Sequence, residues 1–327
     1  MKNNRIEDIV RIFRSRDNFL LSTHVHPDGD GVGAELALAM GLRQLKKNVT
    51  IVNNDPFPQN YSFLLVGGLL KEKVPKHGNF EVGVSLECSD PDRLGRLKDV
   101  FETLGTIVNI DHHPSNEYFG DYNYVQTEAC AVGEQIYDIL KRLRIKIDKR
   151  IAECIYTSIL TDTGSFSYSN TTVRTHEIIV ELLGYGVNPT EVYQNVYEAS
   201  SVGKVILLGK ILGTLELSLD KKIAWVSLTR KMFADTETDY EDAEGMINYA
   251  RSIKSVEAAI SFTELKNGKI KVSFRSKSDK VDVNLIAAFF GGGGHTRASG
   301  CVVDDNMKNT QEKVIRRITR FMKEAGL

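Results

Sequence analysis

Histidine and aspartate side chains come close together near the start of the chain, where His24 is followed by Asp28 and Asp30. Divalent first-row metals such as Mn²⁺ accept imidazole nitrogen and carboxylate oxygen as ligands. A turn whose aspartates only cap the next helix would use the same residue types. One histidine and two aspartates in so short a stretch favour a metal site over a simple turn.

Residues of the same types recur in three later stretches. Asp111, His112 and His113 are consecutive, acidic residues occur at 87–90, and Asp162 lies in the run Thr-Asp-Thr-Gly. Each of these alone could be a packed or capping residue. Taken together with the first stretch they supply six candidate ligands, and six ligands suit two metal ions better than one. Two such ions can hold a phosphate for in-line attack.

Buried strands followed by helices would position these residues. The alternation of apolar residues predicts strands at 18–23, 49–53, 81–86 and 106–110, and helices at 6–13, 34–45, 131–143, 151–161 and 173–183. Alternating strands and helices predict an α/β fold with a doubly wound, mainly parallel sheet. Ligands of such sheets bind at the carboxyl ends of the strands, which is where three of the four stretches fall.

The second part of the chain has a different character. A break in the pattern at 184–189 and the helical segment after it predict three parts: a catalytic domain at 1–188, a helical linker at 189–218 and a smaller α+β domain at 219–327. The smaller domain should contain strands at 223–228, 256–265 and 269–275, and helices at 283–289 and 307–324. Asn267-Gly268 predicts a hairpin between the second and third of these strands.

Charge and apolar content exclude several classes of protein. The chain has 42 Lys and Arg against 43 Asp and Glu, without the positive excess that a binder of long nucleic acid needs. Its four cysteines are dispersed, which favours buried free thiols over disulfides or a structural zinc site. No apolar stretch approaches the ~20 residues of a membrane span, and no signal peptide is visible. We therefore expect a cytoplasmic protein that has no membrane among its partners.

These stretches, together with Gly-Gly-Gly-Gly-His-Thr-Arg-Ala-Ser-Gly at 291–300, resemble the DHH/DHHA1 phosphoesterases, and within them the nanoRNase and pAp phosphatase group. The resemblance covers almost the whole chain. It implies a DHH domain joined by the linker to a DHHA1 domain. It also implies hydrolysis of very short oligoribonucleotides and removal of the 3′-phosphate of pAp. Two divalent ions would serve as cofactors, most often Mn²⁺, with Mg²⁺ or Co²⁺ as alternatives. Members of this family often pair, so a homodimer is an open expectation.

By matching positions, the resemblance assigns the metal ligands to His24, Asp28, Asp30, His112 and Asp162. His113 would contact the scissile phosphate or protonate the leaving oxygen, and Asp111 would orient the neighbouring histidines. In the second domain, glycine N–H groups can approach a phosphate closely. The implied substrate contacts there are Gly293, Gly294, His295, Arg297 and Arg275. For Arg275 the alternative is a solvated charge on an edge strand.

Position 87 departs from the family pattern. Six residues before the motif Arg93, the family has an aspartate that bridges the two metals, and this chain has Glu87. A change of about 1 Å in such a geometry can cost on the order of a hundredfold in rate. Glu87 bridges in an adjusted site, or Asp90 replaces it, or catalysis is weakened and the protein mainly binds nucleotides. We expect Glu87 to be a ligand. Cyclic dinucleotides and pApA are the alternative substrates.

Overall fold

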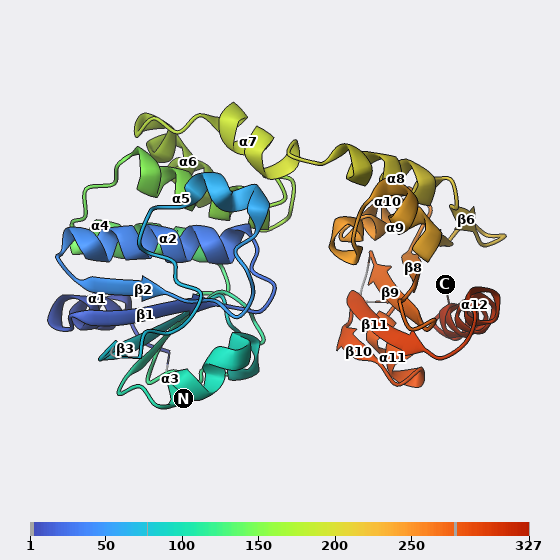
Figure 1. The fold of residues 1–327 in the computed structure, drawn as a ribbon, viewed down its shortest axis with the longest axis horizontal. Coiled ribbons are helices and arrows are strands. Elements are labelled where there is room, and N and C mark those ends of the chain that lie inside the picture. The colour runs from blue at the N-terminus through green and yellow to red at the C-terminus, as the bar shows by residue number, and fades with distance from the viewer. Residues whose placement is uncertain (1–2, 77, 278–279, 327) are drawn as a thin grey trace. The chain divides into compact units, whose positions relative to one another are not determined.

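The computed structural model describes residues 3–76, 78–277 and 280–326. The chain forms two compact units, Met1–Ala199 and Ser200–Leu327 (Figure 1). The division falls inside the segment 189–218, for which the sequence predicts a linker. No helix within the described ranges is long and apolar enough to cross a membrane.

The first unit is built on a sheet of five parallel strands, which confirms the predicted doubly wound α/β fold. The strands are β1 (Asn18–Thr23), β2 (Asn48–Ile51), β3 (Val82–Leu86), β4 (Ile107–Asp111) and β5 (Tyr122–Val125), and their order is β2-β1-β3-β4-β5. Because β2 and β3 lie on opposite sides of β1, the strand order reverses between β1 and β3. Ligands of open α/β sheets bind in the crevice at such a point.

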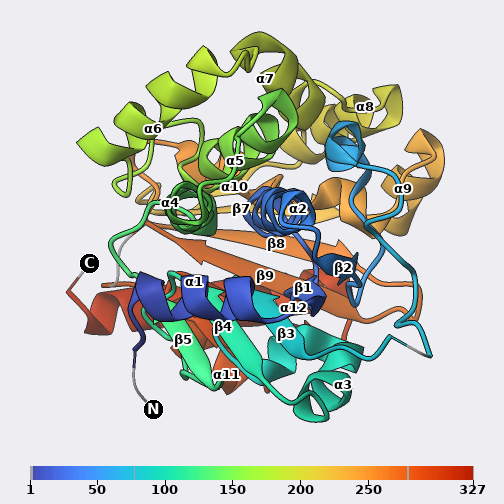
Figure 2. The same cartoon turned by 90° about the vertical axis from the view of Figure 1, so that its left-hand side faces the viewer.

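Helices cover both faces of this sheet. The first unit has α1 (Ile6–Ser15), α2 (Gly29–Gln44), η1 (Gln59–Leu64), η2 (Pro91–Leu97), α3 (Lys98–Glu102), α4 (Val132–Leu143), α5 (Lys149–Asp162), α6 (Val173–Gly184) and α7 (Pro189–Tyr197). Alternate residues of β1 point to opposite faces. Phe19 and Leu21 join the large core under α2, α4 and α5, whereas Leu20 joins a smaller core with Leu94 and Phe101. Figure 2 shows α2 and α3 on opposite sides of the strands.

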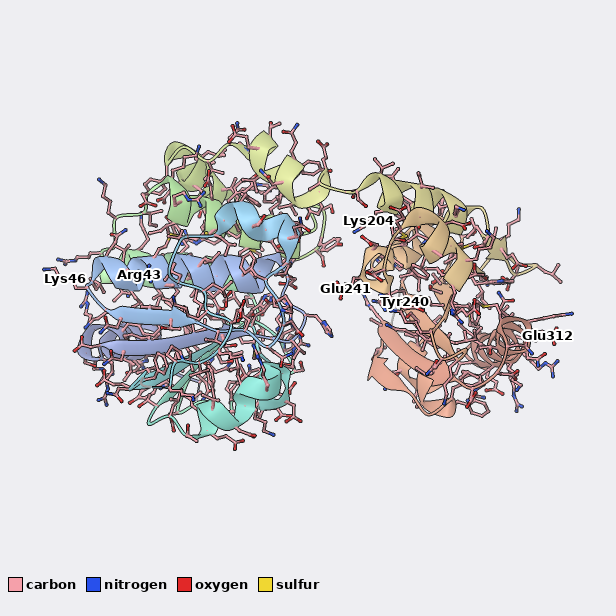
Figure 3. All side chains as sticks on the ribbon, in the orientation of Figure 1. Arg43, Lys46, Lys204, Tyr240, Glu241 and Glu312 are labelled. Carbon is pink, nitrogen blue, oxygen red and sulfur yellow. The ribbon has the colours of Figure 1, made fainter. Side chains whose placement is uncertain are left out.

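The prediction of a helix at 34–45 was wrong at its start, because α2 begins at Gly29. Glycine is a poor helix former, which concealed the first turn in the sequence. The structure gives Gly33 a reason: a Cβ there would lie 2.4 Å from the carbonyl oxygen of Cys154 in α5. At the other end, Lys46 adopts a left-handed φ of 61° and extends outward from the unit (Figure 3).

The second unit has a six-stranded sheet with the order β10-β11-β9-β8-β7-β6. Its elements are β6 (Glu216–Leu217), β7 (Ile223–Leu228), β8 (Ala258–Glu264), β9 (Ile270–Ser276), β10 (Gly293–His295), β11 (Ala298–Val303), α8 (Val202–Leu212), α9 (Arg230–Thr236), η3 (Tyr240–Ala243), α10 (Ile247–Ser252), α11 (Val283–Phe289) and α12 (Met307–Glu324). Strands β8 and β9 pair antiparallel, which confirms the predicted hairpin. Two cores form, one with α8, α9 and α10 and one with α11 and α12.

The glycine-rich stretch at 291–300 is not a simple loop, and two strands in it were missed. Gly293–His295 and Ala298–Val303 pair antiparallel as β10 and β11. Glycine usually weakens a strand interior, so the residue pattern carried no strand signal. Here it permits a close approach: a Cβ on Gly294 would lie 2.6 Å from the carbonyl oxygen of Ala298.

The buried carboxyl group of Glu35, on α2, leads to a prediction about stability. Burial raises the pKa of Glu35 from its ordinary value of 4.5 to about 8, although Asn53 donates a hydrogen bond to it at 2.8 Å. The folded state therefore holds this proton more tightly than the unfolded state. The resulting stabilisation is complete below about pH 4.5 and is lost as the pH rises through about 8.

Replacing Glu35 by Gln should remove this pH dependence. The variant should match the wild type near pH 5 and exceed it by a few kcal/mol near pH 9, at about 1.4 kcal/mol per pKa unit. Urea denaturation at pH 5, 7 and 9 measures the difference. The same substitution at the exposed Glu312, on α12, is the control (Figure 3). An equal gain at all three pH values would contradict the assignment of the proton to Glu35.

Candidate metal centre

His24 follows β1 directly and faces Glu87, which follows β3. Nδ1 of His24 lies 2.7 Å from the carbonyl oxygen of Val25, so this nitrogen carries the hydrogen and Nε2 presents a lone pair. Nε2 lies 3.4 Å from Oε2 of Glu87 and 3.8 Å from Oδ1 of Asp28. Among the described residues, Nε2 of His24 and Oε2 of Glu87 are buried without a hydrogen-bond partner. Two buried acceptors that face each other fit a cation held between them.

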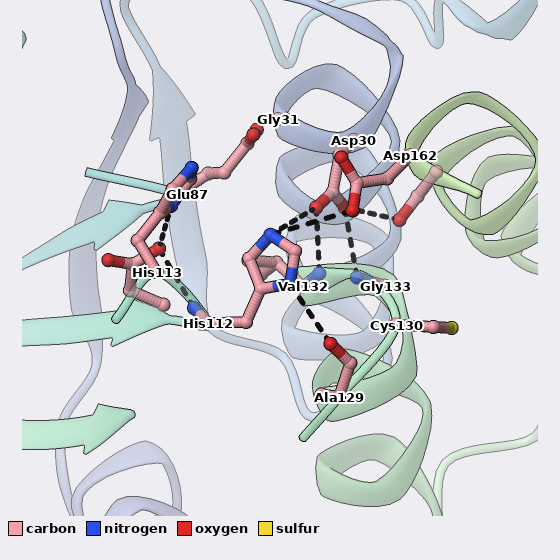
Figure 4. Close-up of polar contacts among 12 residues, drawn as sticks. Asp30, Gly31, Glu87, His112, His113, Ala129, Cys130, Val132, Gly133 and Asp162 are labelled. Atoms are coloured by element: carbon pink, nitrogen blue, oxygen red, sulfur yellow. Dashed lines mark hydrogen bonds and ion pairs between the residues drawn. The ribbon is translucent and has the colours of Figure 1, made fainter. Parts of the chain in front are cut away.

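His112, which follows β4, repeats this arrangement on the other side. Its Nδ1 lies 3.0 Å from the carbonyl oxygen of Ala129, which again directs a lone pair on Nε2 toward carboxylates. Nε2 is 3.7 Å from Oδ2 of Asp30 and 3.7 Å from Oδ2 of Asp162 (Figure 4). Asp162 is the last residue of α5. The carboxyl end of α5 and the carboxyl end of β4 thus supply potential metal ligands to the same group.

Asp30 is held by the first turn of α4. Its carboxylate accepts hydrogen bonds from the backbone N–H groups of Val132 at 2.8 Å and Gly133 at 3.1 Å, and from the hydroxyl of Ser158 (Figure 4). The N-cap residue of α4 is Ala131, which makes no capping hydrogen bond through its side chain. A carboxylate at a helix N-terminus is stabilised by the free N–H groups and by the helix dipole. Asp30 therefore joins α2 to α4 and presents its charge to His112.

Glu87 has an unusual backbone. Its φ is 58°, in the left-handed region, which is energetically unfavourable for a residue with a long side chain. Backbone strain of this kind is often found at functional sites. Its N–H donates to the carbonyl oxygen of Ile110 at 3.0 Å, which fixes the turn after β3. Gly31 leaves room for it: a Cβ there would lie 3.0 Å from Oε2 of Glu87 and 2.2 Å from the hydroxyl of Thr23.

Three groups of side chains have potential ligand atoms within 4.8 Å of one another, and Glu87 belongs to all three. The groups are His24 with Asp28 and Glu87; Asp30 with Glu87, His112 and Asp162; and Glu87 with His112 and His113. The structure thus brings together all six residues that the sequence proposes as ligands. Asp90 belongs to none of these groups; its side chain accepts a hydrogen bond from the N–H of Arg93 and caps η2. Asp28 serves twice, since its Oδ1 also caps α2.

The charges in this cluster need compensation by a cation. Burial, and then the neighbouring carboxylates, raise the pKa of Glu87 well above its ordinary value of 4.5. Burial and the charge of Asp30 raise the pKa of Asp162 to about 7. Burial opposes the protonation of His112, yet Asp30 and Asp162 raise its pKa. Four carboxylates with two imidazole nitrogens match the hard and borderline donors of a divalent first-row metal, so these residues fit such ions.

Asp111 connects the two histidines that follow it. It is fully buried, and it accepts hydrogen bonds from the N–H of His112 at 2.8 Å, from Nδ1 of His113 at 2.7 Å and from the amide of Asn116 at 2.6 Å. Burial alone would raise the pKa of Asp111, but the hydrogen bonds from His113 and Asn116 keep it below its ordinary value. His113 remains partly exposed, with Nδ1 fixed and Nε2 free to meet a ligand.

Of the residues predicted to bind substrate in the second unit, Gly293, Gly294 and His295 lie on β10, Arg275 lies on β9, and Arg297 lies in the turn between β10 and β11. Arg275 on β9 is paired with Ala298 on β11, which is paired with His295 on β10. Strand β9 lies between β11 and β8, so the alternative of an edge-strand charge for Arg275 is wrong. Burial, and then the charge of Arg251, lower the pKa of the Arg275 guanidinium. The side chain of His295 lies outside the described part of the structure.

Several residues that support the centre were not found from the sequence. Ser158 lies inside α5 and Asn116 lies in the loop after β4, and nothing in their spacing distinguishes them from ordinary polar residues. They act through Asp30 and Asp111, which only the fold brings to them.

Comparison with known proteins identifies the family. A model of the DHH family's N-terminal domain matches residues 18–159, and a model of the DHHA1 domain matches residues 221–324. The bifunctional oligoribonuclease and PAP phosphatase NrnA of Thermus thermophilus is 31% identical over 309 residues, covering 94% of this chain and 90% of the relative. The chain belongs to the DHH/DHHA1 phosphoesterases. The resemblance of the motifs is thereby confirmed.

Two further comparisons agree with this family assignment. The protein with the same description in Bacillus subtilis is 30% identical, over 90% of this chain and 92% of its own length. The crystal structure of an exopolyphosphatase-related protein from Bacteroides fragilis has a TM-score of 0.91 at 28% identity, covering 98% of this chain and 97% of that one. As a DHH-family protein with a cluster of acidic and histidine side chains that could hold metal ions, the chain is a metal-dependent phosphoesterase.

Proposed function

We propose that this DHH-family enzyme is a Mn²⁺-dependent phosphohydrolase that cleaves oligoribonucleotides of about dinucleotide size to mononucleotides and converts pAp to AMP. The position of Glu87 carries the proposal, because its carboxylate is common to the potential ligand groups around His24 and around His112. The descriptions of the relatives support this choice of substrates. The balanced charge of the chain argues against long nucleic acid as a substrate.

The proposed chemistry assigns a role to each residue of the centre. Two divalent ions, with Mn²⁺ favoured over Mg²⁺ or Co²⁺, would supply activated hydroxide and neutralise phosphate charge when held by His24, Asp28, Asp30, Glu87, His112 and Asp162. His113 would give a proton to the leaving oxygen. Asp111 would keep the ring of His113 in place through the hydrogen bond to Nδ1.

The second unit would hold the remaining part of the substrate. Backbone N–H groups of the glycine-rich stretch suit a phosphate, and an arginine guanidinium can bind one with two hydrogen bonds. The proposed contacts are Gly293, Gly294, His295, Arg297 and Arg275. Location in the cytoplasm and pairing as a homodimer are also proposed. The four cysteines are buried and free, as suits a reducing compartment, and light scattering tests the dimer.

A side-by-side hydrolysis assay tests the proposed function. The purified protein with Mn²⁺ would receive pAp, an RNA dinucleotide, a longer RNA and pApA, with released phosphate and mononucleotides measured. AMP from pAp and mononucleotides from the dinucleotide are the expected products. Faster degradation of the longer RNA would overturn the proposal. Preference for pApA would favour the alternative of a phosphodiesterase for cyclic dinucleotides and their products.

The change from aspartate to glutamate at position 87 raises a second candidate, a nucleotide-binding protein with weakened catalysis. The variant Glu87→Asp separates the two. If Glu87 serves as the bridging ligand in an adjusted site, the shorter side chain should lower turnover. If glutamate is the cause of weak activity, the variant should raise turnover sharply while pAp binding stays similar.

Metal binding should be visible without any substrate. Saturating Mn²⁺ at about 100 times its Kd should add about 2.7 kcal/mol to the free energy of unfolding, since the ion binds only the folded site. For a unit of this size that corresponds to about 5 °C or more in Tm. Differential scanning fluorimetry with Mn²⁺ and then excess EDTA measures it. An unchanged Tm at millimolar Mn²⁺ would contradict the metal centre.

A further inference from the structure

A cavity of about 450 Å³ lies in the first unit next to the candidate metal centre. Two potential ligands line it: Asp28 from the group with His24, and Asp162 from the group with Asp30 and His112. The other large side chains that line it are four tyrosines, Tyr61, Tyr168, Tyr193 and Tyr197. The volume is in the range of small-molecule sites. Whatever occupies this cavity therefore lies within reach of the reaction.

The tyrosines come from separate parts of the chain, and three of them are open to solvent. Tyr61 belongs to η1, Tyr168 follows α5, and Tyr193 and Tyr197 lie one turn apart on α7, with ring centroids 5.0 Å apart. The exposed fractions of Tyr168, Tyr193 and Tyr197 are 57%, 43% and 40%, whereas Tyr61 is buried. Water contact with large aromatic surfaces is unfavourable, so a group of such rings in one cavity indicates a binding surface.

The backbone is shaped to hold one of these rings. Gly164, Ser165 and Phe166 all have a positive φ, of 54°, 57° and 65°, between the end of α5 and Tyr168. A Cβ on Gly164 would lie 2.3 Å from the ring of Tyr168. The glycine of the Thr-Asp-Thr-Gly motif therefore provides the space in which this ring sits. Strained backbone of this kind gathers at ligand sites.

The chemistry of the lining restricts the ligand. Among the described residues that line the cavity there is no Lys, Arg or His. A phosphate would thus find two carboxylates and no cation from the protein. Phenol rings instead favour a flat, uncharged aromatic group, packed in an offset stack or edge to face. A nucleobase is such a group. It could lie in the cavity while the phosphate, attached to it through the sugar, lies at the metal centre.

We propose that the four tyrosines form a subsite for a nucleobase next to the scissile phosphate, one that selects for the presence of a base and not for its identity. The inference rests on the proposed phosphohydrolase function and adds the part of the substrate that the first unit recognises. Stacking on aromatic side chains is tolerant of base sequence, because every base has a π face. Such a subsite would let the enzyme accept dinucleotides of any sequence.

A binding experiment tests the subsite independently of catalysis. The full-length protein with Mn²⁺ would be titrated with AMP and with ribose 5-phosphate in a calorimeter, since the two ligands differ by the base alone. In the double variant Tyr193→Leu/Tyr197→Leu, the Kd of AMP should rise about tenfold, which is within the range for stacking lost from one base. The Kd of ribose 5-phosphate should change less than about twofold, since it has no base to stack. The matched variant Tyr193→Phe/Tyr197→Phe keeps the rings and should bind AMP as the wild type does.

A kinetic experiment then places the subsite in the reaction. An RNA dinucleotide would be compared with a dinucleotide in which hydrogen replaces both bases. The leucine variant should show a KM raised about tenfold for the first and by less than about twofold for the second, with a much smaller effect on kcat. An equal rise for both substrates, or an unchanged Kd for AMP, would overturn the subsite. If the wild type cleaves neither substrate, the proposed function fails, and the AMP titration still decides on the subsite.

Discussion

Replacing Glu87 by Gln is expected to lower kcat for dinucleotide hydrolysis by at least about 1,000-fold, because the interaction that stabilises the transition state through the ions is removed. An amide keeps the size of the side chain but has no charge to share between the groups around His24 and His112. Loss of both activity and metal affinity should follow. Steady-state kinetics and Mn²⁺ titration measure the two effects.

Without metal, the same variant should be more stable than the wild type. Burial and neighbouring carboxylates raise the pKa of Glu87, so its charged form is unfavourable in the metal-free protein. In the presence of EDTA, the Tm of Glu87→Gln should exceed that of the wild type by about 2–4 °C per kcal/mol of relief. In Mn²⁺ the order should reverse. A variant that is less stable in both conditions would show that Glu87 is mainly structural.

The control for Glu87 lies three residues further along the same turn. Asp90 belongs to no potential ligand group and caps η2. Its replacement by Asn, which is also a good cap, should leave activity within about threefold of the wild type. A large loss of metal affinity in Asp90→Asn would instead support the interpretation in which Asp90 takes the bridging position.

Replacing Asp30 by Asn should impair both activity and folding, whereas the same change at Asp162 should impair activity alone. Both carboxylates face Nε2 of His112 at 3.7 Å, so either variant should lose at least about 100-fold in kcat/KM. Of the two, only Asp30 also accepts hydrogen bonds from the N–H groups of Val132 and Gly133. In the Asp30→Asn variant, one of these buried donors would face the NH₂ group of the new side chain.

The difference between the two variants isolates the contribution of this cap. Both remove one negative charge from the same cluster, so the relief of repulsion in metal-free protein is shared. An unsatisfied buried N–H costs about 1–3 kcal/mol, and Asp30→Asn should be less stable than Asp162→Asn by about this amount in EDTA. Urea denaturation gives the values. Equal stabilities would mean that α4 does not depend on Asp30.

The site residues that directly follow a strand could be located from the sequence alone. The predicted strand at 18–23 agrees with β1 at both ends, and the predicted strands at 81–86 and 106–110 lie within one residue of β3 and β4. In a parallel sheet all carboxyl ends meet at one edge, so His24, Glu87 and His112 could be placed together without knowing the strand order.

Features that depend on close packing or on distant residues could not be predicted. Gly29 and Gly33 reduce helix propensity locally, and only their close contacts with Thr161 and Cys154 of α5 show why glycines stand in the first turns of α2. The left-handed φ of Glu87 leaves no trace in sequence, because glutamate rarely adopts it. The tyrosine cavity joins η1, the turn after α5 and α7, and no periodicity connects residues so far apart.

The division of the chain into two units has a consequence for denaturation. Each unit has hydrophobic cores of its own, and the cores of the first unit share no residue with those of the second. Only residues 198–201 connect α7 to α8. Multidomain chains of this kind commonly depart from two-state unfolding. Calorimetric scans should therefore resolve two endotherms. Mn²⁺ should raise the midpoint temperature of the first unit's endotherm and leave that of the second unit unchanged.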